Sequence, residues 1–380
     1  MNIWKIVALA LAAVALSAAT VLAAPTDQGR KVAAYVAAWE NWSAKDIDAK
    51  KLTNINLSFA RIEEGVIANV RVDGKSIEDY HFAELKKAKE VNPNLKVSIA
   101  VGGWGGDGFS DAALTPESRE KFADSVVTYI KKYDLDGIDI DWEYPVQGGW
   151  GAIKARTEDK ENFTLFMKAL REKLDQLGTN ENRNYLLTYA ASVQPWAIAN
   201  LEFDKVVPLV DAIYLMTYDY HGAWEPQTGH LSPLYPNAKD TLGIGGTADA
   251  VKRYLAAGAP PEKIIFGTPF YGRYWQGVEK KEHGLYQKAS NQGGGQATYK
   301  EIVEKYSAKQ DFKRYWDDSA KAAYLFNEKT GVFVTFNDLE ALNYEMEFVR
   351  NMKLGGVFLW ECTQDNKGVL LDKLYQGMNK

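Results

Sequence analysis

The sequence contains very little cysteine, with one residue in 380, Cys362. A single cysteine cannot form a disulfide within the chain, so a large hydrophobic core has to hold the fold together. Histidine is also rare, and its four copies are scattered without the spacing of metal ligands. They are His81, His221, His230 and His283. We expect a protein that uses neither a metal nor a cofactor.

Long apolar runs are absent after the N-terminus. There, a short basic segment ending at Lys5 precedes the run IVALALAAVALSAATVL, and small residues then lead to the polar PTDQG. This order is typical of a secretory signal peptide over residues 1–23. A membrane anchor is the alternative, but the run is shorter than the roughly 20 residues of a spanning helix, and small and hydroxyl residues interrupt it. We expect cleavage after Ala23 and a secreted protein, either extracellular or periplasmic.

An excess of positive charge is absent too, because 45 Lys and Arg residues face 50 Asp and Glu residues and give a net charge of −5. Loss of Lys5 with the signal peptide makes this about −6. The acidic balance argues against nucleic acid or an anionic membrane surface as the main partner. We expect a monomer that has no membrane contact after signal cleavage.

Eight short apolar runs, rich in β-branched and aromatic residues, alternate with amphipathic stretches of helical length such as 118–134 and 158–178. This alternation predicts right-handed β-α-β units and a parallel sheet. Eight units in a mature chain of residues 24–380 favour an α/β fold of the (β/α)8 TIM barrel type, although an open doubly wound sheet has a similar count. The runs are KVAAYVAAW (31–39), TNINLSFA (53–60), LKVSIAVGG (95–103), GIDIDWEY (137–144), LLTYAAS (186–192), AIYLMTYDY (212–220), KIIFGTPFYG (263–272) and GGVFLWE (355–361).

More than eighty residues separate the seventh run from the eighth, which is too many for a plain unit. This interval contains Gly-rich punctuation (GGG, 293–295), a helix-like TYKEIVEKYSAK and a hairpin-like AAYLFNEKTGVFVTF with a turn near residues 329–331. We interpret residues 275–335 as a small α+β insertion within the barrel, between strand seven and strand eight. No Pro/Ser/Thr-rich linker marks a detachable module.

The stretch DGIDIDWEYP, residues 136–145, places four carboxylates within eight residues of a strand-like segment. Burying several acids together costs free energy unless they are paired or share protons. Active sites of parallel barrels lie at the carboxyl ends of the strands, and this stretch closes strand four. Because side chains alternate, Asp139, Asp141 and Glu143 share the face toward the barrel interior or mouth. Asp136 has the opposite parity, so we predict a structural role for it.

Successive acids of this row are only about 6.5–7 Å apart at Cβ, so their titrations are coupled and at least one proton should be retained. Glu143 is last in the row and nearest the opening, where a retained proton suits a glycosidic leaving oxygen. A metal site and a structural cluster paired with Lys and Arg are the alternatives. A hard-cation site usually mixes oxygen ligands on a flexible loop, so we favour catalysis.

The row Asp136-x-x-Asp139-x-Asp141-x-Glu143 resembles the signature of family 18 glycoside hydrolases, the chitinases. Four further stretches resemble motifs of the same family in the expected order, on strands three, six, seven and eight. They are AVGGW (100–104), MTYDYHGAW (216–224), GTPFYGRYW (267–275) and GGVFLWE (355–361). The resemblance covers nearly the whole mature chain, and the insertion before strand eight is like that of a bacterial chitinase subfamily.

The resemblance implies a role for each matching residue. Glu143 would act as general acid and later as general base, while the 2-acetamido oxygen of the substrate attacks the anomeric carbon in place of a carboxylate nucleophile. Asp141 would orient the acetamido group and stabilise the oxazolinium ion, and Asp139 would share a proton with Asp141. Tyr218 would donate to the acetamido carbonyl, and Asp219 would bind the sugar at the cleavage site.

The resemblance also implies a cleft lined by aromatic residues at the carboxyl ends of the strands. Trp360 would form the floor under the reacting sugar, with Trp104 and Trp224 on the leaving-group side. The remaining lining residues would be Phe59, Tyr144, Met216, Arg273 and Tyr35, the last supporting the inner aspartate. Core packing is the commoner fate of a Trp. We leave Trp39, Trp42, Trp150, Trp196, Trp275 and Trp316 undecided between cleft and core.

The chain departs from the family at Ala100, where many members have a Ser that can hydrogen-bond the inner aspartate. Ser98 lies on the same strand face and is a candidate substitute. We therefore predict a shifted acid limb of the pH–rate profile.

Three functions remain open at this point. The first is a secreted, retaining chitinase acting on chitin or N-acetylglucosamine oligosaccharides. The second is a related endo-β-N-acetylglucosaminidase or peptidoglycan-directed hydrolase. The third is a non-catalytic chitin-binding lectin, which the presence of Glu143 disfavours because such lectins typically lack the acid.

Overall fold

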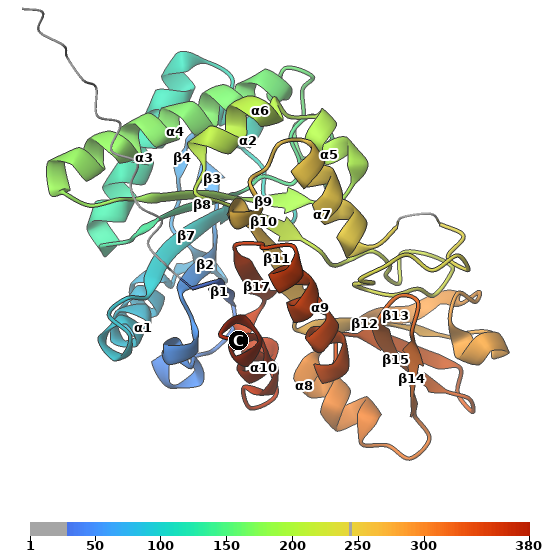
Figure 1. The fold of residues 1–380 in the computed structure, drawn as a ribbon. Coiled ribbons are helices and arrows are strands. Elements are labelled where there is room, and N and C mark those ends of the chain that lie inside the picture. Colours follow the sequence, from blue (N-terminus) through green and yellow to red (C-terminus); the bar gives the residue numbers. More distant parts are fainter. Residues whose placement is uncertain (1–28, 243–244) are drawn as a thin grey trace, which may run out of the picture.

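Eight parallel strands close into a barrel in the computed structural model, which describes residues 29–242 and 245–380. The strands are paired around the ring in the order β1, β17, β11, β10, β9, β8, β7, β2 (Figure 1). All eight predicted runs form a barrel strand, so the predicted fold is confirmed. The predicted signal peptide, residues 1–23, lies outside the described residues. The barrel strands are β1 (Lys31–Ala37), β2 (Asn54–Ala60), β7 (Lys96–Gly102), β8 (Gly137–Asp141), β9 (Leu186–Ser192), β10 (Ala212–Met216), β11 (Ile264–Pro269) and β17 (Gly356–Trp360).

Helices surround the barrel, and their local sequences set their ends. Helix α3 begins after Thr115, whose hydroxyl accepts a hydrogen bond from the backbone N–H of Ser118, and Pro116 occupies its first position. Its apolar face packs into the core between barrel and helices. The main helices are α1 (Glu78–Val91), α3 (Pro116–Tyr133), α4 (Asp159–Glu181), α7 (Thr247–Ala256), α9 (Leu339–Asn351) and α10 (Val369–Met378). Shorter ones are α2 (Phe109–Ala112), α5 (Pro195–Ala199), α6 (Phe203–Val206) and α8 (Tyr299–Glu301).

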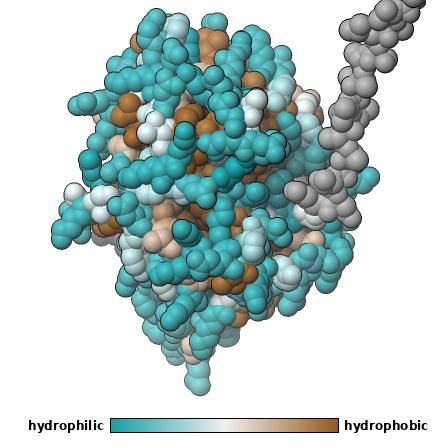
Figure 2. Space-filling view, turned by 90° about the vertical axis from the view of Figure 1, so that its left-hand side faces the viewer, coloured by the Kyte–Doolittle hydropathy of each residue, from teal (hydrophilic) through white to brown (hydrophobic). Residues whose placement is uncertain are grey.

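Strand β8 shows how the barrel divides its side chains between two sides. Ile138 and Ile140 are fully buried in the core between the strands and the helices. Asp139 and Asp141 alternate with them and face the interior of the barrel. Figure 2 shows one outer face of the molecule, where hydrophilic residues cover most of the surface and hydrophobic residues show in small areas between them. Within the described residues, no helix is both long and apolar enough to cross a bilayer.

The insertion contains a five-stranded antiparallel sheet in the order β13, β12, β16, β15, β14. Figure 1 shows it on one side of the barrel, near α9. The glycines 293–295 lie inside strand β13, and Gly295 pairs with Tyr274 of β12 next to an irregularity in the register. The strands are β12 (Tyr271–Gln276), β13 (Ser290–Thr298), β14 (Lys313–Asp317), β15 (Ala322–Asn327) and β16 (Val332–Phe336). Two small hairpins follow β2, formed by β3 (Ile62–Glu63) with β4 (Val66–Ile67) and by β5 (Arg71–Val72) with β6 (Lys75–Ser76).

The long segment between β10 and α7 is attached to this insertion by hydrogen bonds. The Leu231 N–H donates to Thr335 Oγ1 at 2.9 Å, and the Leu234 N–H donates to the Ala320 carbonyl at 2.9 Å. His230 Nε2 lies 3.0 Å from the Asp317 carboxylate. The insertion therefore holds the segment that follows strand six in place.

Candidate active site

The three acids of the row lie together at the end of β8, and all of their side chains are buried. Asp139 pairs with Ala100 of the neighbouring strand, and Asp141 pairs with Gly102. Gly102 has φ +107° and lies so close that an added Cβ would be 2.2 Å from the Asp141 carbonyl oxygen. Only glycine fits at this position, which brings the loop after β7 directly against the acids.

Asp139 is the innermost acid and accepts two hydrogen bonds from neighbouring strands. The Tyr35 hydroxyl of β1 donates to Oδ2 at 2.6 Å, and the Thr188 hydroxyl of β9 donates to Oδ1 at 2.5 Å. Burial raises the pKa of Asp139 to about 6, although both hydrogen bonds act in the opposite direction. Thr188 thus fills the place for which the sequence suggested Ser98.

Burial near other acids favours the protonated forms of Asp141 and Glu143. Burial, followed by the charges of Glu143 and Asp139, raises the pKa of Asp141 well above its ordinary value. Burial raises the pKa of Glu143 to about 7, with a hydrogen bond from Tyr144 opposing it and the Asp219 charge adding to it. Oδ1 of Asp141 has no hydrogen-bond partner among the described side chains and backbone groups. The outer pair therefore has a proton to give near neutral pH.

Arg61, which follows β2, is a charged neighbour that sequence reasoning missed. Its guanidinium donates to the Gly102 carbonyl, and its positive charge lowers the pKa of both Asp141 and Glu143. It is the cation that limits how far burial can raise these values. No motif marks it, because a single Arg after a strand is ordinary in sequence.

Arg273 holds Asp219 close enough to Glu143 for its charge to raise the pKa of that acid. Nε and Nη2 of Arg273 each donate to one Asp219 oxygen at 3.0 Å, a bidentate pair. The same guanidinium lies over the Trp224 ring at 5.0 Å and the Tyr271 ring at 5.2 Å. Asp219 itself has φ 57°, a left-handed conformation that Asp tolerates better than most residues. The structure thus brings together Asp219, Trp224 and Arg273, three of the residues predicted to line the cleft.

A buried cluster of charged side chains stabilises the segment after β10, which carries Asp219. His221 Nδ1 lies 2.7 Å from the Glu225 carboxylate, and Nε2 lies 3.0 Å from the Asp240 carboxylate. Burial lowers the pKa of His221, but its hydrogen bonds to Asp240 and Glu225 outweigh this and raise the pKa to about 9. A charged imidazole between two carboxylates therefore ties the two ends of the segment together.

Aromatic rings form the floor of the barrel mouth. Trp360 stacks on Phe59 with ring centroids 5.4 Å apart and 16° between the planes. Trp39 stacks on the same Phe59 ring at 6.2 Å and lies 6.3 Å from the Trp360 ring. It is about half exposed, so it belongs to the mouth rather than the core. Tyr35 belongs to one interior cluster of the barrel, against which Phe59, Met216, Tyr218 and Trp360 pack.

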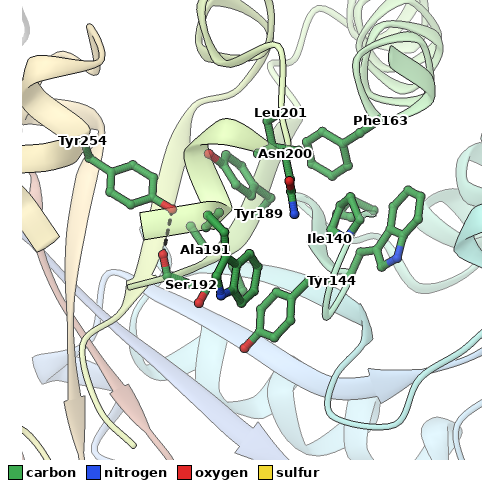
Figure 3. Close-up of a pocket in the computed structure, with 14 residues that line it drawn as sticks. Ile140, Tyr144, Phe163, Tyr189, Ala191, Ser192, Asn200, Leu201 and Tyr254 are labelled. Atoms are coloured by element: carbon green, nitrogen blue, oxygen red, sulfur yellow. Dashed lines mark hydrogen bonds between the residues drawn. The ribbon is translucent and has the colours of Figure 1, made fainter. Parts of the chain in front are cut away.

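Tyr144, the residue after the acid, forms another part of the mouth with two tryptophans. Its ring lies edge-on to Trp104 at 6.5 Å and to Trp196 at 5.1 Å. Behind it is a cavity of about 20 Å³, shown in Figure 3, where Ser192 accepts a hydrogen bond from the Tyr254 hydroxyl at 2.8 Å. This volume holds one water molecule and is far too small for a sugar ring. A saccharide has to bind in the open mouth instead.

The remaining tryptophans divide between core and surface. Trp42 is buried against His81, with ring centroids 4.5 Å apart, and Trp275 is buried in the core of the insertion. Trp316 stacks on Tyr344 of α9. Trp150 projects from the loop after β8 and is 68% exposed.

Asp136 lies at the opposite end of the strand from Glu143. Its carboxylate contacts Lys89 at 2.7 Å, Arg183 at 2.9 Å and Lys96 at 3.3 Å. Burial alone would raise its pKa, but the hydrogen bonds and charges of these partners outweigh burial and lower it. Its surroundings therefore keep this acid ionised.

The mouth of the barrel thus combines a carboxyl group of raised pKa, buried neighbouring acids and flat aromatic rings. A buried acid with a pKa of about 7 can donate a proton to a leaving oxygen, and the aromatic faces suit the C–H faces of a sugar.

Comparison with known proteins agrees with this chemistry. The chain matches glycosyl hydrolases family 18 over residues 31–365 and belongs to that family of glycoside hydrolases. Chitinase A1 of Niallia circulans is 34% identical to it over 403 residues, covering 90% of this chain and 58% of that protein.

Two solved bacterial structures share the fold. Chitinase ChiW of Paenibacillus sp. str. FPU-7, a multi-modular cell-surface enzyme, has a TM-score of 0.87 at 40% identity, covering 92% of this chain and 43% of that one. A family 18 N-acetylglucosaminidase from Paenibacillus barengoltzii has a TM-score of 0.83 at 36% identity, covering 92% and 99%. The chain therefore spans about half of Chitinase A1 and of ChiW, and nearly all of the third protein.

Proposed function

We propose that the protein is a secreted chitinase that hydrolyses β-1,4 linkages between N-acetylglucosamine units of chitin and chitooligosaccharides, with retention at the anomeric carbon. The observation that carries this proposal is the row of buried acids at the barrel mouth, which ends in Glu143 with a pKa raised to about 7. The names of the relatives support chitin as the substrate.

In the first step, the Glu143 carboxyl group donates its proton to the glycosidic oxygen while the bond from that oxygen to the anomeric carbon breaks. The acetamido oxygen of the same sugar forms the new bond to the anomeric carbon, which yields an oxazolinium ion. The proton that Asp141 shares with Asp139 passes to Asp139, and the resulting Asp141 carboxylate accepts a hydrogen bond from the acetamido N–H and stabilises the positive charge. Tyr218 donates to the acetamido oxygen. Asp139, held by Tyr35 and Thr188, keeps the inner end of the row in place.

In the second step, the Glu143 carboxylate takes a proton from water, and the water oxygen attacks the anomeric carbon from the face that the leaving group vacated. The ring of the oxazolinium opens and the acetamido group is restored. Both steps invert the anomeric centre, so the product keeps the β configuration. The charge of Asp141 is useful only while the cation exists, which makes its effect specific to the transition states.

A second candidate is an exo-acting enzyme that releases single N-acetylglucosamine units. It is favoured by the similarity to the N-acetylglucosaminidase of Paenibacillus barengoltzii, whose length the chain matches almost completely. The catalytic row serves both activities equally well, so the product pattern has to distinguish them.

The test is product analysis with purified residues 24–380 and a six-unit N-acetylglucosamine oligomer, resolved by anomer within minutes. We expect early β-anomer from the wild type and product formation slower by about 10²–10⁴-fold from Glu143→Gln, while that variant still binds the oligomer. Dimers and trimers would indicate chitinase action, and monomer alone would indicate the exo candidate. Early α-anomer, or cleavage by Glu143→Gln at the wild-type rate, would contradict the mechanism.

A further inference from the structure

Trp150 is the most exposed large apolar side chain within residues 29–242 and 245–380, at 68% of its surface. It lies on the loop that leads from β8 to α4, seven positions after Glu143. Leaving an indole in water gives up the free energy of burying it, so an exposed Trp needs another reason to be held in place.

The part of Trp150 that is covered rests on Gly105. A Cβ added to Gly105 would be 3.2 Å from Cε3 of the indole and 3.6 Å from Cζ3. Gly105 has φ +80° and follows Trp104, which is itself 57% exposed. Trp150 therefore lies against the residue that directly follows Trp104 on the neighbouring loop. The Trp104 ring in turn lies edge-on to Tyr144 at 6.5 Å.

The loop that carries Trp150 is anchored on both sides of the indole. On its N-terminal side, the Gly148 N–H donates to the Tyr144 carbonyl at 2.9 Å. On its C-terminal side, Lys154 Nζ and Arg156 Nη2 both reach one Asp111 oxygen, at 2.8 and 2.5 Å. A ring on a fixed loop loses little further freedom on binding, which favours affinity.

We propose that Trp150 and Trp104 form an extension of the cleft that binds one further N-acetylglucosamine unit of the chitin chain, beyond the sugar that Trp104 contacts. The extension lies on the leaving-group side, where the sequence predicts Trp104. The indole face of Trp150 packs on the C–H face of the sugar. This inference rests on the proposed function, because it takes the same polymer as its ligand.

The experiment compares kcat/KM for N-acetylglucosamine oligomers of two to six units in the wild type, Trp150→Ala and Trp150→Phe. Tyr80→Ala is the control, since Tyr80 is an aromatic residue of α1 that is also about half exposed. We expect the ratio of kcat/KM for the six-unit oligomer to that for the dimer to fall on the order of tenfold in Trp150→Ala. Trp150→Phe should recover most of this ratio, and Tyr80→Ala should keep the wild-type ratio.

An unchanged length ratio in Trp150→Ala, with the wild type active on the oligomers, would overturn the extension and leave the proposed function intact. A wild type that cleaves no oligomer of any length would instead overturn the proposed function and the extension together. Equal losses in Trp150→Ala and Tyr80→Ala would also contradict the inference, because they would reflect a general effect of losing an exposed ring.

Discussion

Carboxyl groups at the two ends of strand β8 have pKa values shifted in opposite directions. At the N-terminal end, Asp136 is surrounded by Lys89, Lys96 and Arg183, and its pKa is lowered. At the C-terminal end, Asp141 and Glu143 are surrounded mainly by apolar groups and by other acids, and their pKa values are raised.

Burial is common to both ends, so burial by itself does not decide what a carboxyl group does. The number of cationic side chains close to the carboxyl group decides whether it is ionised or protonated. An acid with several cationic partners stays ionised and stabilises the fold, whereas an acid that shares its surroundings with other acids keeps a proton that it can transfer.

The largest expected effect is that of Glu143→Gln at the C-terminal end. We expect kcat to fall by about 10²–10⁴-fold, because general acid–base catalysis is removed while the shape of the side chain is kept. Initial rates on a chitin oligomer, together with a circular dichroism spectrum that matches the wild type, check this. Residual activity within tenfold of the wild type would mean that another group donates the proton.

At the N-terminal end, Asp136→Asn should affect stability instead. Removing the charge leaves three cations around a buried neutral group, and we expect a loss of about 3 kcal/mol in the free energy of unfolding. Urea denaturation measures this loss, and kcat at 25 °C should stay close to the wild-type value. A large loss of kcat in a folded variant would show that the two ends of the strand are functionally coupled.

The pH dependence of kcat/KM in the wild type tests whether the acid at the C-terminal end of β8 has a raised pKa. Because burial raises the pKa of Glu143 to about 7, its reactive protonated form is lost as the pH rises through 7. We expect kcat/KM to fall by about tenfold for each pH unit well above that value. A profile that stays flat to pH 9 would contradict the assignment of Glu143 as the acid.

A smaller effect is expected from Thr188→Val. The Thr188 hydroxyl stabilises the ionised form of Asp139, so its removal should raise the pKa of Asp139 above about 6 and lower activity by about fivefold. The pH–rate profile measures the shift. Ser98→Ala is the matched control, with an expected profile like that of the wild type, and equal shifts in both variants would refute the role of Thr188.

The smallest effect is expected from Ala100→Ser. Ala100 lies opposite Asp139 on the adjacent strand, and a hydroxyl there could donate to the carboxylate and lower its pKa. We expect the acid limb of the pH–rate profile to move to lower pH by less than about one unit. No movement would show that Tyr35 and Thr188 already satisfy Asp139.

Much of the fold and the row of acids could be predicted from the sequence, because both follow from patterns that repeat along the chain. Apolar runs at regular intervals predicted the eight strands, and the alternation of side chains placed Asp139, Asp141 and Glu143 on one face and Asp136 on the other. Contacts between distant strands have no such period. The roles of Thr188 and Arg61 could therefore be identified only in the structure, where β9 and the loop after β2 bring them close to the acids of β8.

The structure gives one of the three glycines at 293–295 a role that the sequence did not indicate. Gly295 of β13 pairs with Tyr274, and an added Cβ would be 3.0 Å from the Tyr274 hydroxyl. The close approach of this ring favours the absence of a side chain at Gly295.

The hydrogen bonds that join the insertion to the segment after β10 have a consequence for how the protein loses function on heating. Thr335 and Ala320 of the insertion hold Leu231 and Leu234, and the same segment carries Tyr218, Asp219 and Trp224. If the insertion melts, these three groups lose their support even while the eight-stranded barrel stays intact. The temperature of inactivation is then set by the smaller sheet, and mutations that stabilise the insertion are the ones that should extend the working range of the protein.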